Sequence, residues 1–181
     1  LLAARGAGDA EDLLSLLLAA EQRGEISHVE ILGFCFLLII AGNETTTKLI
    51  GNMVCELDRH PHQRERLLCD SLLVPNAVEE VLRYASSTHM MARTLTRDVE
   101  LHGCRMEKGR KVALILASAN RDERRWPEPD VFDIGRDTSD HLAFGFGVQH
   151  CIGAALARLE ARVALAEILA HLPDFRVERD E

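Results

Sequence analysis

The chain has 181 residues, of which 47% are hydrophobic, and its formal net charge at pH 7 is -8. This apolar content is enough for a hydrophobic core and argues against intrinsic disorder. The acidic balance argues against a nucleic-acid partner, because no basic excess is available to meet phosphates. The longest apolar run, from Ile31 to Ala41, is too short for a membrane span, which needs about 20 apolar residues.

Cysteine usage points to a reducing compartment. The five cysteines are widely spaced, with no CxxC pair: Cys35, Cys55, Cys69, Cys104 and Cys151. An odd, scattered set argues against both a disulfide framework and a zinc site. We therefore expect reduced thiols in a cytoplasmic protein.

The N-terminal half predicts helices. Asp9 is a candidate cap for the helical segment DLLSLLLAAEQR. Ser27 followed by Glu30 is a capping-box pattern, and it opens a much longer helix that must end before Pro61. A shorter helix carrying AVEEVLRYA follows.

The pattern changes in the second half. TRDVELHG alternates polar and apolar residues as a strand does, and RKVALILAS is a β-rich run. After the irregular stretch NRDERRWPEPDVFDIGRD, residues 152–172 are helical again. One apolar stripe on this last helix comprises Ile152, Leu156, Leu159, Val163, Ala166 and Ala170. Helices dominate, with a small β portion in the middle.

The long helix contains a polar interruption, AGNETT. Gly42 disfavours the helix by about 1 kcal/mol relative to Ala, and a Gly beside Thr can let the helix ladder open. Polar groups in a core are expensive unless they are paired. The stretch is therefore either a helix emerging into solvent or an acid–alcohol pair, Glu44 and Thr45, that handles protons beside a buried ligand.

Two charged features in the middle of the chain are ambiguous on their own. Glu80 and Arg83 lie three residues apart on one helical face, and such pairs are usually exposed and contribute little. Arg93 lies among apolar and β-forming residues in THMMARTLT. It is either a solvated strand residue or a cation that reaches a buried anionic group.

The most distinctive stretch is FGFGVQHCIGAALARLE, from Phe144 to Glu160. Its glycines give conformational freedom and allow close backbone approach. Cys151 stands at the start of the last helix, where unpaired N–H groups and the helix dipole favour a thiolate. A lone cysteine is most often an inert core residue. Here the scarcity of bulky neighbours predicts a flat shelf for a large planar group bonded to the sulfur.

Taken in chain order, these features resemble the haem-thiolate monooxygenases of the cytochrome P-450 superfamily, in which a cysteine ligates haem. FGFGVQHCIG matches the family's haem-binding loop F-G-x-G-x-[H/R]-x-C-x-G, AGNETT matches its oxygen-activation segment, and Glu80-x-x-Arg83 matches its ExxR motif. LASANRDERRWPEPDVFD resembles the meander before the haem loop. The resemblance extends from about Asp9 to Arg176 and is of the soluble bacterial kind.

The resemblance implies a fold that is mainly α with a small β portion. Its parts in order would be a long central helix, the ExxR helix, a β-hairpin region, the meander, the cysteine loop and a final long helix. Family members carry about as much chain again before the point where Leu1 begins. We therefore expect residues 1–181 to form the C-terminal half of a cytochrome P-450 domain, with the N-terminal half absent.

The family's cofactor roles carry over by position. Cys151 would be the axial thiolate on the iron of haem b, the implied cofactor. The further haem contacts would come from Arg93, Phe144, Gly145, Gly147, Gln149 and Gly153. Gln149 departs from the pattern, because the family usually has His or Arg there on a haem propionate; the amide can hydrogen-bond, but the charge pairing is lost.

The remaining roles are catalytic, structural and substrate-lining. Gly42 would give the groove for oxygen, and Glu44 with Thr45 would deliver protons. Glu80 and Arg83 would form a structural ion pair. Many members add an arginine to this pair at a site occupied here by Val131. The substrate pocket would be lined by Thr88, His89 and Met90.

The implied function is insertion of one atom of O2 into a small organic substrate, with electrons from a redox partner, a ferredoxin and ferredoxin reductase in bacterial members. The alternative is a truncated or degenerate haem-binding protein without monooxygenase activity, which the intact pair Glu44 and Thr45 argues against. A hydrolase using Cys151 and His150 is disfavoured, because adjacent residues at a helix start point apart and no orienting acid is evident.

Overall fold

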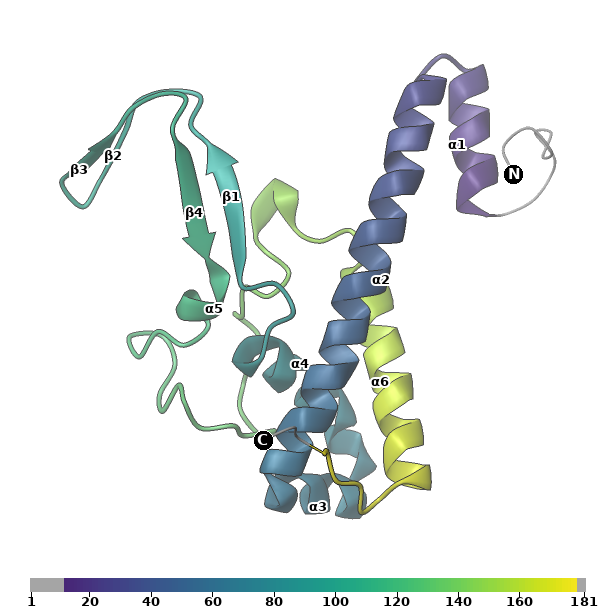
Figure 1. The fold of residues 1–181 in the computed structure, drawn as a ribbon, viewed down its shortest axis with the longest axis vertical. Helices are drawn as coiled ribbons and strands as arrows, with labels where there is room; N and C mark the ends of the chain where they lie inside the picture. The colour runs from purple at the N-terminus through teal and green to yellow at the C-terminus, as the bar shows by residue number, and fades with distance from the viewer. Residues whose placement is uncertain (1–11, 179–181) are drawn as a thin grey trace. The chain divides into compact units, whose positions relative to one another are not determined.

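The computed structural model describes residues 12–178. They divide into two compact units, with the boundary between Glu44 and Thr45 inside one long helix. Figure 1 shows the elements of both units. As the sequence predicts, the described chain is mainly helical with a small β portion.

The first unit holds α1 (Leu13–Gln22) and the first half of α2 (His28–Arg59). The carboxylate of Asp12 caps α1 by accepting a hydrogen bond from the Ser15 backbone N–H at 2.9 Å. The cap predicted at Asp9 lies outside the described residues. Since Asp12 is only three residues before Ser15, it has the Ncap geometry that the segment requires.

A capping box opens α2, as predicted. The Ser27 N–H donates to Glu30 Oε2 at 2.7 Å, and the Glu30 N–H donates to Ser27 Oγ at 3.3 Å. The helix then runs for 32 residues and ends before Pro61. By length and composition α2 is apolar enough to cross a membrane, a test that the core helix of a soluble protein also passes.

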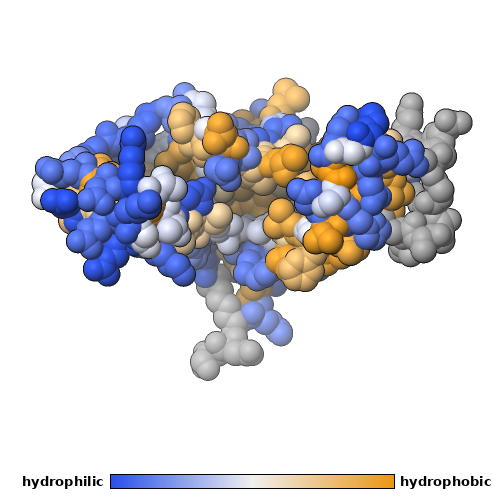
Figure 2. Space-filling view, turned by 90° about the horizontal axis from the view of Figure 1, so that it is seen from above, coloured by the Kyte–Doolittle hydropathy of each residue, from blue (hydrophilic) through white to orange (hydrophobic). Residues whose placement is uncertain are grey.

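The first unit exposes much of its apolar surface, and Figure 2 shows hydrophobic residues, in orange, at the α1–α2 end. Phe36 is 67% exposed and Ile39 is 71% exposed, whereas Ile31 is fully buried. The exposed apolar residues of this part of α2 are Val29, Leu32, Phe36, Leu37, Leu38, Ile39 and Ile40. Because Phe36 to Ile40 are consecutive, the exposed apolar surface surrounds this part of the helix, as expected where a helix normally contacts other apolar surfaces.

The second unit has a helical core built by the end of α2, by α4 (Val74–Tyr84) and by α6 (Ala154–His171), and α4 packs against α6. Two further helical elements, α3 (Pro61–Cys69) and η2 (Ser71–Leu73), connect α2 to α4. The sequence analysis did not predict α3. The buried residues include Leu49, Met53, Leu57, Val78, Val81, Phe132, Ile134, Ala161 and Leu165.

The packing of α6 differs from the predicted stripe. Residues of that stripe are exposed, among them Leu156, Leu159 and Val163, whereas Ala161 and Leu165 are fully buried. The helix carries apolar residues around most of its circumference, so spacing alone could not identify the buried face.

Two small antiparallel pairs make up the β portion. Strand β1 (Met90–Thr94) pairs with β4 (Lys111–Ile115), and β2 (Val99–Leu101) pairs with β3 (Cys104–Met106). The strand predicted across RKVALILAS stops at Ile115. The residues that follow form a short helix, α5 (Leu116–Ala119).

Candidate functional site

The cysteine loop, defined as residues 144–153, connects the irregular meander to α6 and folds back on itself. The Cys151 N–H donates to the Phe144 carbonyl at 2.8 Å, and the His150 N–H donates to the Gly147 carbonyl at 3.0 Å, closing η3 (Gly147–Gln149). Gly145 has φ +75° and Gly147 has φ +68°. Both lie in the left-handed region that side chains disfavour, so the loop requires glycine at these two positions.

The cysteine loop exposes its thiol and several large apolar side chains. Cys151 is exposed, as are Phe146 at 84%, Val148 at 100% and Ile152 at 85%. No other atom lies within 4 Å of the place where a Cβ on Gly147 would be. An exposed thiol in a loop that also exposes three large apolar side chains fits a planar apolar ligand bonded through sulfur.

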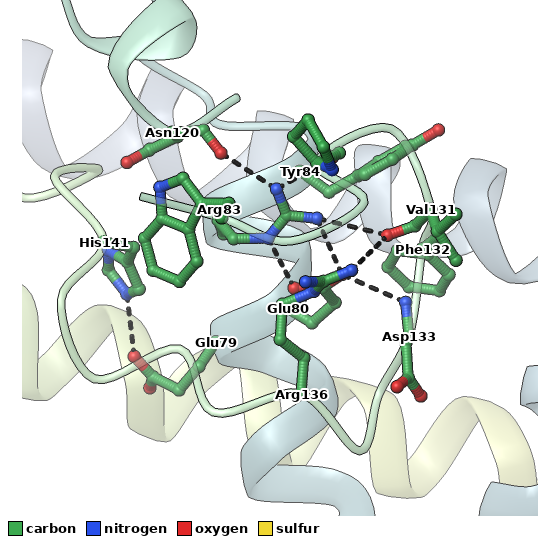
Figure 3. A network of polar contacts seen from close by, with 12 residues as sticks. Glu79, Glu80, Arg83, Tyr84, Asn120, Val131, Phe132, Asp133, Arg136 and His141 are labelled. Atoms are coloured by element: carbon green, nitrogen blue, oxygen red, sulfur yellow. Dashed lines mark hydrogen bonds and ion pairs between the residues drawn. The ribbon is translucent and has the colours of Figure 1, made fainter. Parts of the chain in front are cut away.

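The ExxR pair lies fully buried behind the cysteine loop's entry segment. Arg83 Nε donates to Glu80 Oε2 at 2.7 Å, and Arg83 Nη2 donates to Glu80 Oε1 at 2.9 Å. The same guanidinium donates to the backbone carbonyls of Asn120, Pro129 and Val131 at 2.8, 3.0 and 3.3 Å. Figure 3 shows the fork of Arg83 between the glutamate and these carbonyls.

Asn120 links this pair to the cysteine loop. Its backbone carbonyl accepts from Arg83, and its side-chain Oδ1 accepts from the Leu142 N–H at 2.7 Å, two residues before the loop begins. Asn120 is fully buried. The ion pair therefore fixes the backbone that leads into the loop, which is a structural role.

A second arginine, Arg136, completes the buried network. Its Nε lies 3.5 Å from Glu80 Oε1, and its guanidinium donates to the carbonyls of Pro127, Glu128 and Val131 (Figure 3). The sequence analysis assigned this place to Val131, and that assignment is wrong. Val131 contributes its backbone carbonyl, and its side chain is 47% exposed.

The sequence analysis missed Arg136 because it lies in an irregular segment, where no helical or strand periodicity relates it to Glu80. A local signal was nevertheless present. In FDIGRD, an arginine lies four residues after Phe132, the aromatic residue that anchors the segment in the core. Counting from the buried aromatic residue would have found it.

The residues of the polar interruption lie in mid-helix. Gly42, Glu44 and Thr45 all belong to α2, which stays α-helical through them, so the ladder opening considered for Gly42 is not observed. No atom lies within 4 Å of a Cβ built on Gly42. The structure leaves room beside the helix backbone at this point.

The other predicted cofactor contacts are exposed. Arg93 lies in β1 opposite Val112, and its Nη1 donates to the carbonyl of its neighbour Ala92. Gln149 ends η3 with an exposed side chain. Both polar groups are accessible to an anionic group of a ligand.

The predicted substrate-lining segment connects α4 to β1. The Thr88 carbonyl accepts from Ser86 Oγ at 3.1 Å, the His89 carbonyl accepts from the Ala117 N–H at 3.1 Å, and Met90 begins β1. The backbone of this segment is thus fixed at both ends.

Comparison with known proteins identifies the family. The family model described as Cytochrome P450 matches residues 70–180. The chain is 44% identical over 171 residues to Cytochrome P450 109 of Bacillus spizizenii, covering 94% of this chain and 42% of that protein. It is 48% identical over 167 residues to the methyl-branched lipid omega-hydroxylase of Mycobacterium tuberculosis, covering 91% of this chain and 39% of that protein.

Solved structures agree with the sequence comparison. Cytochrome P450 CYP109Q5 from Chondromyces apiculatus superposes with a TM-score of 0.87 at 51% identity, over 93% of this chain and 44% of that one. The chain belongs to the cytochrome P450 family. It spans about two fifths of the length of the curated relatives it matches.

The cysteine loop fits the haem that this family implies. Within residues 12–178 no group of three or more His, Cys, Asp or Glu side chains could hold a metal ion. A cysteine ligand to iron suits a metal already held by a porphyrin. The exposed apolar surface beside the thiol provides the contact area that such a ring needs.

Proposed function

We propose that this chain is part of a haem-thiolate monooxygenase that binds haem b through Cys151. The observation that carries the proposal is the exposed thiol of Cys151 in a loop with exposed apolar side chains, its backbone held by the hydrogen bond from the Cys151 N–H to the Phe144 carbonyl. When bound, thiolate-ligated haem supplies the activation of O2 for insertion of one oxygen atom into an organic substrate.

The chain's own residues would hold the cofactor in two ways. The apolar side chains of Phe146, Val148 and Ile152 would cover the ring and exclude water from the sulfur. Arg93 and Gln149 would hydrogen-bond the propionates; the arginine supplies a positive charge, and the glutamine an uncharged amide donor.

Proton delivery is assigned to α2 by the resemblance. The Thr45 hydroxyl would donate a proton near the oxygen-binding position. The Glu44 carboxyl group would then return a proton to Thr45. The open space beside Gly42 supports this assignment, because a side chain there would narrow the groove. Thr88, His89 and Met90 would face the substrate.

We base the proposed substrate class on the relatives and the proposed location on the cysteines. A methyl-branched lipid omega-hydroxylase among the relatives makes methyl-branched lipids the first substrate class to test. A ferredoxin with its reductase would supply the electrons. All five cysteines are free, which supports a reducing, cytoplasmic location.

Haem titration of the 181-residue chain tests the central claim. Ferrous protein with carbon monoxide should show a thiolate-shifted Soret band in the wild type and in Cys104→Ala, a matched exposed cysteine, and should lose it in Cys151→Ala. An unchanged band in Cys151→Ala, or no haem uptake by the wild type, would refute the proposal for this chain.

Turnover is a separate test. With a ferredoxin system and a panel of methyl-branched lipids, Thr45→Ala should consume electrons without forming product, whereas Thr46→Ala should keep the two coupled. Haem binding without product in the wild type would favour the alternative function, a haem-binding protein that does not oxygenate.

A further inference from the structure

One carboxylate outside the ExxR pair, that of Glu79, contacts two arginines and a histidine. Glu79 Oε1 accepts from Arg158 Nε at 2.7 Å, and Glu79 Oε2 accepts from Arg158 Nη2 at 3.0 Å, which makes a bidentate pair between α4 and α6. His141 Nε2 lies 2.9 Å from Glu79 Oε2, and Arg162 Nη2 lies 3.8 Å from Oε1.

The tautomer of His141 follows from its two hydrogen bonds. The Ala143 backbone N–H donates to His141 Nδ1 at 3.2 Å, so Nδ1 carries no proton. The proton is therefore on Nε2, which donates to Glu79 (Figure 3). With its side chain only 4% exposed, His141 connects the carboxylate to the backbone one residue before Phe144.

Two partners of Glu79, Arg158 and His141, contact the Phe144 ring. The Arg158 guanidinium lies over this ring at 4.6 Å from its centroid, and the His141 ring centroid lies 5.9 Å away. A guanidinium held by a carboxylate keeps its orientation over the aromatic face. Glu79 thus acts on Phe144 along two routes.

Phe144 in turn holds Cys151. Its carbonyl accepts the Cys151 N–H at 2.8 Å, and its ring packs at the edge of the core. Fixing the Phe144 ring fixes the carbonyl that sets the position of the cysteine backbone.

We infer that Glu79 is a positioning residue for the Cys151 ligand: through Arg158 and His141 it fixes Phe144, and Phe144 fixes the cysteine backbone. Only the effect on haem ligation rests on the proposed function. The mechanical link itself is independent of haem, so it can be measured in its absence.

The adjacent carboxylate provides a contrast. Figure 3 shows Glu79 and Glu80 pointing in different directions from α4, Glu79 toward His141 and Glu80 toward Arg83. Glu80 binds Arg83 and the Asp133 N–H in the buried network, whereas Glu79 binds partners that reach the loop. Loss of Glu79 should loosen the loop while leaving the helical core in place.

The first experiment measures hydrogen exchange at single amides of the haem-free chain. Glu79→Gln keeps the size and one acceptor but loses the charge and the bidentate pair. We expect exchange at the Cys151 amide to accelerate about tenfold more than exchange at the Ala85 amide, which caps the C-terminal end of α4. Arg158→Lys, which keeps the charge and loses the fork, should give a smaller acceleration. Glu65→Gln, an exposed residue of α3, is the matched control and should change neither amide.

The second experiment uses the haem-loaded chain. In Glu79→Gln the total haem bound should stay the same, while the fraction with a thiolate-shifted Soret band in the carbon monoxide complex falls. Equal acceleration at the Cys151 and Ala85 amides would show a general stabilising role and would overturn the inference, as would an unchanged Cys151 amide in both variants. Failure of the proposed function would instead appear as a wild-type spectrum that does not depend on Cys151.

Discussion

We expect the side chain of Arg136, and not that of residue 131, to be the second one that stabilises the buried network around Glu80. The test is Arg136→Met, which keeps an unbranched apolar stem and removes the guanidinium. Val131→Ala is the matched control, because it removes a half-exposed side chain and leaves the backbone carbonyl of residue 131 in place.

The magnitude follows from the contacts that are lost. Arg136 donates to the carbonyls of Pro127, Glu128 and Val131 at 2.5, 3.0 and 3.1 Å. All three residues are exposed. Water can therefore replace part of each bond, which leaves a net loss of about 1 kcal/mol per bond, or about 3 kcal/mol in all. The 3.5 Å contact to Glu80 adds little, because Arg83 still neutralises that carboxylate.

Pulse proteolysis in urea at low protein concentration suits this measurement, since it needs little protein and limits aggregation. A loss of about 3 kcal/mol corresponds to a fall in Tm of roughly 10 °C for a chain of this size. Val131→Ala should cost less than about 1 kcal/mol. An Arg136→Met variant within 1 kcal/mol of the wild type, or a Val131→Ala variant that is equally destabilised, would contradict the assignment.

Two further predictions concern pH and solubility. Burial raises the pKa of Glu79, but hydrogen bonds from His141 and Arg158, together with the charge of Arg158, outweigh it and hold the pKa at about 2, below the ordinary 4.5. This stabilisation is fully present above about pH 4.5 and is lost as pH falls towards 2. The difference in unfolding free energy between wild type and Glu79→Gln should thus be about 2 kcal/mol at pH 7, allowing for solvent screening, and smaller at pH 3.5; a pH-independent difference would contradict this. Replacing exposed Phe36 and Ile39 by lysine should raise the monomer fraction in size-exclusion chromatography, whereas an unchanged fraction would show that this face does not drive association.

Interactions between residues within four positions of each other could be predicted from the sequence. The capping box of Ser27 and Glu30 is confirmed because both partners lie in the same helical turn. The pairing of Glu80 with Arg83 follows from the same geometry, since residues three apart share a helix face. Helix spacing alone does not predict the burial of that pair, which followed only from the family resemblance and depends on chain segments about forty residues further on.

Features that depend on distant segments were missed. The buried face of α6 is decided by what packs on it, because several of its faces are apolar. Arg136 reaches Glu80 from an irregular loop 56 residues away, and no periodicity encodes that return. The same holds for His141, which meets Glu79 across 62 residues.

The adjacent pair Glu79 and Glu80 shows why a motif alone understates the site. The ExxR pattern uses only the second glutamate and leaves the first as a nondescript charge on a helix. Successive residues of an α-helix are turned by about 100°, so the two carboxylates cannot share one partner. One of them fixes the meander through Arg83 and Arg136, and the other reaches the cysteine loop through Arg158 and His141. Neither carboxylate can compensate for loss of the other, because each is held on its own side of α4.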